Sequence, residues 1–326
     1  MRLGKLSNHD LERLLLSKFR PQRPEVVLGP GVGLDCAVVD LGGELCVLSS
    51  DPITSASAHM GALAVHVCCN DAAAAGAQPI GVMTTLLLPP GTLDEELERI
   101  ADDVAQAAWQ AGIDVLGGHT EFTDAVTRPL ISATILAKAP QGRLVDAGHM
   151  QVGDGLYMTK WAALEGSFIL ATDDEKKVRT LLTAQEYDQV LGWGEALSIV
   201  PEASAAWQAG AHAMHDATEG GVLGAAWEMA QASRCGLDMQ SAAIALRPES
   251  IKIAAGFGMD PLRLMASGCL LIALPDQNAG ALQKQLDDRG IALSRIGTAV
   301  PAAQGVRCDG QALCPPAADE RYKAMG

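Results

Sequence analysis

The sequence predicts an α/β protein of two domains, and three observations lead to this prediction. The chain has 326 residues, which at ~150 residues per domain is room for about two domains. Hydrophobic residues make up 48 % of the chain and charged residues 19 %, which is a globular composition. Strand-like and helix-like stretches alternate in both halves, separated by turns rich in Gly and Pro. Because aromatic residues are only 4 %, we expect small aliphatic side chains to fill the core.

The chain begins with a predicted helix over residues 8–20, in which leucines recur at helical spacing and which Ser7 can cap. We expect this helix to dock on a sheet. Two apolar runs over 36–40 and 45–48 flank a Gly-Gly pair, so they predict a β-hairpin.

A buried helix is predicted over 60–75 and a buried strand over 79–88. A capping box that begins at Thr92 predicts the next helix, which we expect to end at Gly112. A short strand over 114–116 is then predicted to lead into a loop.

The stretch from 139 to 155 has many glycines and little periodicity. We therefore interpret 140–155 as a junction between an N-terminal domain over 1–139 and a C-terminal domain over 156–326. The predicted elements after the junction are a strand over 156–159, helices after Lys160 and Leu181, a helix started by Pro201, a helix over 221–232, a strand over 269–274, a helix over 278–288 and a strand over 294–296.

The net charge of the chain restricts the kinds of molecule that it can bind. The formal net charge of −15 repels nucleic acid and anionic membranes, so we expect neither as a partner. The uncharged stretches 52–70 and 72–93 are polar or interrupted by Gly and Pro, which is unlike a membrane span, and no signal peptide is visible.

Eight cysteines without a Cys-x-x-Cys pair indicate a reducing compartment, and we expect a cytoplasmic protein.

Three acidic residues, Asp35, Asp51 and Asp71, follow or interrupt predicted elements. Taken singly, each is explained as a turn or cap residue. Asp71 differs because it lies inside an otherwise apolar helix, where an unpaired carboxylate is costly. If the three converge, they form an oxygen site suited to Mg²⁺, which commonly bridges substrate phosphates.

Three glycine-containing stretches are candidate phosphate sites. The stretch 29–33 precedes a strand, so it is neither a Walker loop nor a Rossmann fingerprint. The stretch 117–120 follows a strand and offers backbone N–H groups for an anion. The stretch 215–221 lies at the start of a predicted helix, where the dipole favours phosphate. An N-cap followed by a glycine turn explains this last stretch equally well.

Several of these stretches together resemble a known family, the PurM-like ATP-binding superfamily. This superfamily contains aminoimidazole ribonucleotide synthetase, the hydrogenase maturation protein HypE, thiamine-monophosphate kinase and selenophosphate synthetase. The matching stretches occur in the family's order, and they are 31–39, Ser50-Asp51, 70–79, Gly117-Gly118-His119-Thr120-Glu121, 215–221 and 267–271.

The resemblance implies a protein that dimerises through its N-terminal sheets and holds Mg²⁺ and ATP in a cleft between its domains. It assigns Asp35, Asp51 and Asp71 to the metal. It assigns to the nucleotide Gly31, Gly33, Asn70, Gly117, Gly118, Thr120, Asp216, Thr218, Gly220 and Gly221.

Departures from the family pattern place the chain nearest to HypE-like, AIR synthase-related proteins. His119 stands where the family usually has an acidic residue, and Glu121 follows two residues later. The terminal cysteine of HypE is absent, and the last cysteine here is Cys314. No cysteine occurs in 29–33, unlike in selenophosphate synthetases.

The leading hypothesis is an ATP-dependent enzyme that phosphorylates an amide or carbonyl oxygen of a small-molecule substrate. His119 or Glu121 would move the proton. One alternative is an ATP-binding dimeric scaffold or sensor without turnover, and another is a small-molecule kinase. A protein partner is expected if the chain acts as HypE does.

Overall fold

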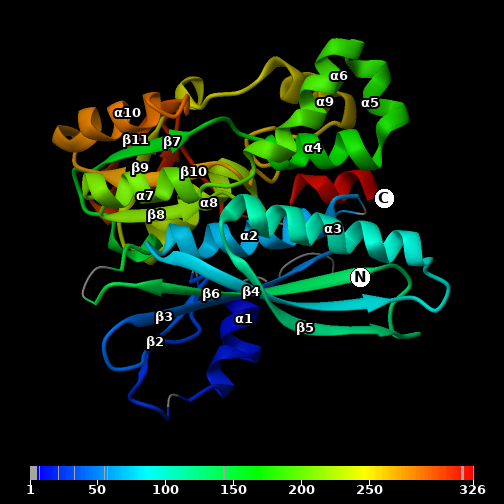
Figure 1. Cartoon of the computed structure of the whole chain (residues 1–326). Coiled ribbons are helices and arrows are strands. Elements are labelled where there is room, and N and C mark those ends of the chain that lie inside the picture. Colours follow the sequence, from blue (N-terminus) through cyan, green and yellow to red (C-terminus); the bar gives the residue numbers. More distant parts are fainter. Residues whose placement is uncertain are drawn as a thin grey trace.

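The computed structural model describes residues 6, 8–20, 22–32, 34–54, 56, 58–141, 144–316 and 319–325. Two β-sheets with their covering helices lie against each other, one from each half of the chain (Figure 1). The predicted α/β class is therefore confirmed. Within the described residues no helix is long and apolar enough to cross a bilayer.

The N-terminal sheet has the strand order β1-β2-β3-β6-β4-β5. Neighbouring strands are antiparallel except β4 and β5, which are parallel. The predicted hairpin is present as β2 and β3. The strands are β1 (Val26–Leu28), β2 (Ala37–Asp40), β3 (Leu45–Ile53), β4 (Gln78–Leu88), β5 (Asp114–Phe122) and β6 (Leu130–Ala139).

Two helices, α2 (Met60–Ala74) and α3 (Asp94–Ala111), cover the face of this sheet that turns toward the C-terminal half (Figure 1). Helix α2 is buried almost all round because it lies between the sheet and the C-terminal half. The two helices pack closely at Gly61, where a Cβ atom would lie 2.5 Å from the carbonyl oxygen of Ile100. In the part of the chain that the structure describes, no such helical layer covers the opposite face of the sheet.

The C-terminal half forms a sheet with the order β13-β12-β9-β11-β7-β10-β8. Its strands are β7 (Gly155–Thr159), β8 (Ala213–Asp216), β9 (Gly236–Met239), β10 (Leu270–Leu274), β11 (Leu293–Val300), β12 (Val306–Cys308) and β13 (Gln311–Ala312). Its helices are α4 (Leu164–Asp173), α5 (Glu175–Leu181), α6 (Ala184–Leu191), α7 (Val200–Ala209), α8 (Gly221–Ala232), α9 (Pro248–Phe257) and α10 (Ala279–Asp287). Short 3₁₀ helices include η3 (Gly192–Ala196) and η7 (Glu320–Met325).

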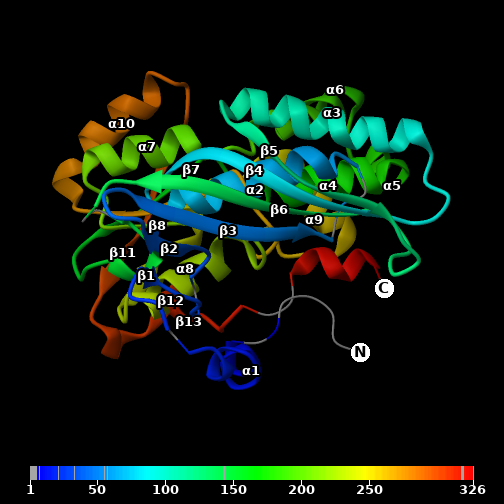
Figure 2. The same cartoon turned by 60° about the horizontal axis from the view of Figure 1, so that its bottom comes forward.

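The first helix is shorter than predicted, and its expected docking on a sheet is wrong. Helix α1 covers Asn8–Leu14, is followed by a 3₁₀ turn over Leu16–Lys18, and has no buried residue. It projects from the body of the protein in both views (Figures 1 and 2). The predicted cap Ser7 lies outside the described residues.

The capping box predicted at Thr92 is also wrong. The N-cap of α3 is Leu93, and it makes no side-chain capping bond. The Thr92 hydroxyl instead donates to the carbonyl oxygen of Pro89 at 2.9 Å. The predicted end at Gly112 is confirmed, because Gly112 caps the helix in the left-handed conformation that glycine tolerates.

The predicted loop after the short strand is absent. Residues 117–121 continue strand β5, which pairs along its length with β4. Gly118 serves this pairing, since a Cβ atom on it would lie 1.8 Å from the carbonyl oxygen of Thr84. The stretch is therefore an exposed edge strand and not a loop, and its role in anion binding stays a prediction.

Candidate functional site

A cleft of about 390 Å³ opens between the N-terminal sheet and the C-terminal half. Its volume is within the ~300–1,000 Å³ typical of small-molecule sites. We call this space the interdomain cleft, and its polar lining residues are Asp35, Asp51, Thr54, Asp71, Glu165, Thr218, Glu219, Ser267 and Tyr322.

The three predicted metal acids all line this cleft, although they come from separate elements. Asp35 lies just before β2, Asp51 lies toward the end of β3, and Asp71 lies near the end of α2. The sequence analysis made the convergence of these three acids a condition for a metal site, and the structure meets this condition.

Asp71 is only 4 % exposed, and the Ser49 hydroxyl donates to its Oδ2 at 2.5 Å. Burial raises the pKa of Asp71 well above its usual range, and the nearby charges of Asp216, Asp35 and Asp51 raise it further. Ionised carboxylates this close to Asp71 repel its negative charge. A bound cation would relieve this repulsion.

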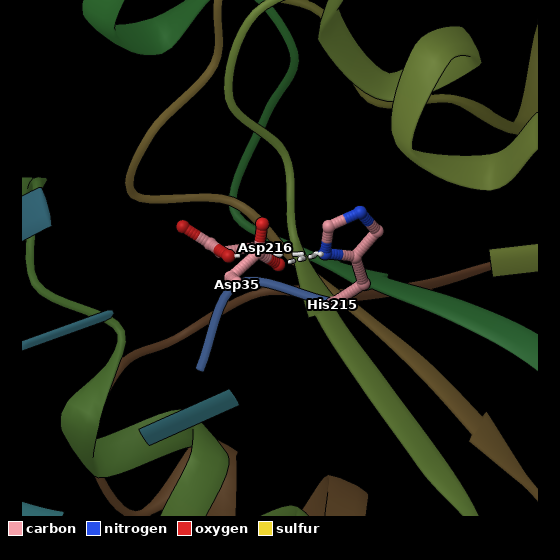
Figure 3. Close-up of side chains that lie close together, drawn as sticks. All are labelled: Asp35, His215 and Asp216. Atoms are coloured by element: carbon pink, nitrogen blue, oxygen red, sulfur yellow. Dashed lines mark ion pairs between the residues drawn. The ribbon is translucent and has the colours of Figure 1, made fainter. Parts of the chain in front are cut away.

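The side chain of His215 links the C-terminal half of the protein to Asp35 in the N-terminal half (Figure 3). Nδ1 of His215, on β8, lies 3.4 Å from Oδ2 of Asp35 and 3.9 Å from Oδ1 of Asp216. Its Nε2 lies 3.3 Å from Oε2 of Glu228 on α8. Burial lowers the pKa of His215, but the hydrogen bond with Glu228 and the charges of Asp35 and Asp216 outweigh burial and raise it to about 9.

The side chains present fit a hard divalent cation. One ligand atom from each of Asp35, His215 and Asp216 lies within 4.8 Å of the others, the single such group among the described residues. Because the raised pKa of His215 keeps its ring protonated near pH 7, the carboxylate oxygens are the donors that this group offers to a cation. Asp51 and Asp71 add oxygen donors on the adjoining wall of the cleft. No Lys or Arg occurs among the described lining residues, so a metal ion is the partner that this cleft favours for a phosphate group.

The predicted nucleotide residues of the C-terminal half divide into two groups. Thr218 lines the cleft, and Asp216 lies beside it as part of the His215 contact. Gly220 and Gly221 begin α8 with positive φ values of 84° and 63°. The N–H of Gly220 already donates to Oδ2 of Asp319 at 2.8 Å, so its hydrogen atom is not directed at the cleft.

Asn70 is fully buried and does not reach the cleft. Its Nδ2 donates to the carbonyl oxygen of Leu197 at 2.8 Å, and its Oδ1 accepts from the N–H of Ile199 at 2.9 Å. Both ends of the amide therefore hold helix α2 to the C-terminal half. The sequence suggested contact with the nucleotide, whereas the structure shows an interdomain clamp.

The described members of the remaining predicted set do not line the cleft. Gly31 is in the loop beside α1, and Gly33 lies outside the described residues. The predicted residues on β5 are exposed at the edge of the sheet, and they are Gly117, Gly118, His119, Thr120 and Glu121. Nε2 of His119 lies 3.1 Å from Oε2 of Glu121. Within one subunit these side chains do not line the cleft, so their roles stay predictions.

Glu165 and Tyr322 are among the cleft residues that the sequence analysis did not single out. Glu165 lies in the buried part of α4, and burial raises its pKa to about 7 although a hydrogen bond with Ser267 opposes the shift. A lone carboxylate in the apolar stretch 164–171 is the same signal that singled out Asp71. Tyr322, whose hydroxyl bonds to Oε1 of Glu219 at 3.2 Å, gave no signal because its place depends on the path of the C-terminal segment.

Comparison with known families agrees with this architecture. Residues 33–139 match the family model of the AIR synthase related protein, N-terminal domain. Residues 151–309 match the model of the C-terminal domain of the same family. The two matches together span most of the chain, so the chain belongs to the AIR synthase related family. The predicted resemblance to the PurM-like superfamily is confirmed.

Individual relatives extend this result. Carbamoyl dehydratase HypE of Rhodobacter capsulatus is 27 % identical over 289 residues, which cover 85 % of this chain and 80 % of that protein. The structure of AaThiL complexed with AMPPCP and TMP has a TM-score of 0.76 at 18 % identity and covers 98 % of both chains. The HypE-HypF complex contains a chain with a TM-score of 0.72 at 18 % identity, covering 92 % of this chain and 96 % of that one. The structural likenesses show a shared fold.

Proposed function

We propose that this protein uses ATP and Mg²⁺ to activate an amide or carbonyl oxygen of a small substrate by phosphorylation. The observation that carries this proposal is the convergence of three carboxylates in a cleft whose described lining has no basic side chain. With a net charge of −15, the protein would repel a bare triphosphate. A nucleotide is therefore expected to enter only together with a divalent cation.

The proposal gives different roles to the acidic residues and to the hydroxyl groups of the cleft. Asp35, Asp51 and Asp71 would hold Mg²⁺, which when bound neutralises phosphate charge. The hydroxyl groups of Thr218 and Ser267 line the same space and can donate to phosphate oxygens. The family membership of the chain and the AMPPCP-bound ThiL fold support a nucleotide in this position.

Glu165 is the proton acceptor that the cleft supports best. When the amide oxygen forms its bond to the γ-phosphorus, the bond from that phosphorus to the β-phosphate oxygen breaks and ADP leaves. The amide N–H proton must then pass to a base, giving a phosphorylated imidate. A buried carboxylate whose pKa is about 7 is suited to accept this proton near neutral pH.

A homodimer is the assembly we propose, through the face of the N-terminal sheet that α2 and α3 leave uncovered. Met83 is about half exposed there. Dimerisation is also the route by which His119 and Glu121 on β5 could approach the cleft of a second subunit. We further propose a cytoplasmic location, since all eight cysteines are free, and a protein partner, as HypE has in the HypE-HypF complex.

The test is calorimetric titration with ATP, with and without Mg²⁺, followed by assay of released phosphate. Binding should require Mg²⁺, and Asp71→Asn should weaken it by about tenfold or more. Asp188→Asn, an exposed change on α6, is the matched control and should leave affinity unchanged. Mg²⁺-independent binding, or equal effects of both variants, would contradict the site.

The same assay separates the alternatives. Phosphate release that rises with amide or carbonyl substrates supports oxygen activation. Equal amounts of ADP and a phosphorylated product, without free phosphate, would instead indicate a small-molecule kinase. Tight Mg²⁺-dependent binding with no turnover on any substrate would indicate the scaffold or sensor.

A further inference from the structure

A second cavity, of about 260 Å³, lies where α2 and α3 meet α4, α6 and η3. Leu63 forms part of the wall of both cavities, and Phe168 faces this one while the next residue, Ile169, lines the interdomain cleft. The two spaces therefore lie back to back. They share no polar side chain. We call the second space the rear cavity, and its polar lining residues are His59, His66, Asp103, Gln106, Gln110 and Glu195.

His66 is the observation that first points to a ligand. This side chain lines the rear cavity and is only 6 % exposed, yet its Nδ1 has no hydrogen-bond partner. Burial lowers the pKa of His66 to about 4, so the ring is neutral near pH 7 and has one nitrogen able to accept. A buried polar atom without a partner costs about 1–3 kcal/mol, which a bound donor would offset.

The acidic side chains around the rear cavity favour a ligand with positive charge. Asp103 and Glu195 supply carboxylates from the two halves of the protein, and no Lys or Arg occurs among its described lining residues. Oδ1 of Asp103 lies 4.0 Å from Nδ1 of His59, and burial raises the pKa of this carboxyl. A ligand that brings positive charge would be attracted by both acids.

The size and the aromatic wall of the rear cavity favour a small molecule. Its volume is below the ~300 Å³ at which drug-sized sites begin. The rings of His59 and Phe168 lie at its wall with centroids 5.6 Å apart. Aromatic faces attract cations, and Leu63 and Leu197 supply apolar surface against which a planar group can pack.

From this geometry we propose that the rear cavity binds a small organic cation with planar N–H donors, of the amidine or guanidinium class. Its N–H groups would donate to Asp103, to Glu195 and to a ring nitrogen of His66. Because the ligand would contact α2 and α3 on one side and α4 and η3 on the other, it would bridge the two halves of the chain. The inference does not depend on ATP or Mg²⁺.

The test uses benzamidine as the probe, with no nucleotide present, and follows the imidazole ¹⁵N resonances of the protein by NMR. Saturable shifts of His66 and His59 are expected. Benzamide has the same shape without the charge and should bind about tenfold or more weakly. Asp103→Asn should weaken benzamidine by a similar factor, whereas Asp102→Asn, an exposed change next to it, should alter affinity less than about twofold.

His66→Leu provides a second variant if Asp103→Asn perturbs folding. It removes an unpartnered buried polar group, so the fold should tolerate it, while benzamidine affinity should fall by about fivefold. Equal binding of benzamide, equal effects of Asp103→Asn and Asp102→Asn, or unchanged binding to His66→Leu would overturn the proposal. Loss of binding in Asp71→Asn alone would assign the probe to the interdomain cleft instead.

Discussion

Two carboxylates of the interdomain cleft, Asp71 and Glu165, lie in helices that are otherwise apolar. Each is nearly excluded from solvent, and burial raises the pKa of each. Such residues reduce the stability of the ligand-free protein, and their retention in a cleft is typical of functional sites. For Glu165 the pKa shift leads to a direct measurement.

The stability cost of Glu165 should depend on pH. Its pKa rises from 4.5 to about 7 on folding, so protonation stabilises the fold fully below about pH 4.5, and this stabilisation is lost as the pH rises through 7. Glu165→Gln has no such charge. It should therefore be more stable than the wild type by about 3 kcal/mol at pH 8, and by less than about 1 kcal/mol at pH 5.

Urea unfolding at the two pH values measures this difference. Glu98→Gln, which removes an exposed carboxylate on α3 outside the cleft, is the control and should not reproduce this difference between the two pH values. A Glu165→Gln effect that is equal at pH 5 and pH 8 would contradict the assignment of a buried, protonated carboxyl.

The N-terminus of α8 is the element whose role the tertiary structure changed most. The sequence left two interpretations of this stretch open, a phosphate site and an N-cap with a glycine turn. In the structure the cap comes from elsewhere: Asp319, 99 positions away, accepts the N–H of Gly220. Arg321, two residues later, pairs with Asp173 on α4 at 3.2 Å and fixes this segment.

Asp319→Ala should lower the stability of the protein, because it removes this distant cap of α8. The substitution leaves the buried N–H of Gly220 without its acceptor, and we expect a loss of about 2 kcal/mol in stability. Amide hydrogen exchange at Gly220 should become faster. Asp319→Asn keeps an acceptor oxygen and should restore most of the protection, whereas unchanged exchange in Asp319→Ala would mean that the bond is not formed in solution.

At the scale of the whole molecule, the N-terminal sheet is covered on one face and open on the other. Met83 is 51 % exposed on a strand that has neighbours on both sides, which is unusual for an apolar side chain inside a sheet. Ile80, near the start of the same strand, is 39 % exposed. Exposed apolar side chains on a sheet without a covering layer are typical of an interface.

We expect Met83→Asp to convert a dimer into a monomer, because the new carboxylate would be buried without a partner between two subunits. Light scattering after size exclusion measures the mass against the 33.9 kDa of one chain. Trp109→Asp is the control, since Trp109 is 82 % exposed on α3, on the covered side of the sheet. A monomeric wild type, or dissociation by Trp109→Asp, would contradict the proposed interface.

Local sequence patterns predicted the α/β class, most strands and helices, and the residue types of the proposed metal site. These depend on local patterns: apolar periodicity fixes 221–232 as a helix, and a carboxylate in an apolar helix marks Asp71 wherever that helix packs. The family resemblance had the same origin, because its motifs are short and continuous.

Only the tertiary structure decided which of these residues meet. Asn70 bonds to Leu197 across 127 positions, and Asp319 reaches Gly220 across 99, and neither distance is contained in a local pattern. The loop predicted at 117–121 was wrong for the same reason, since the close approach that requires Gly118 arises from β4 and not from its own segment. Long-range packing, which local propensity does not encode, places the side chains that form the cleft.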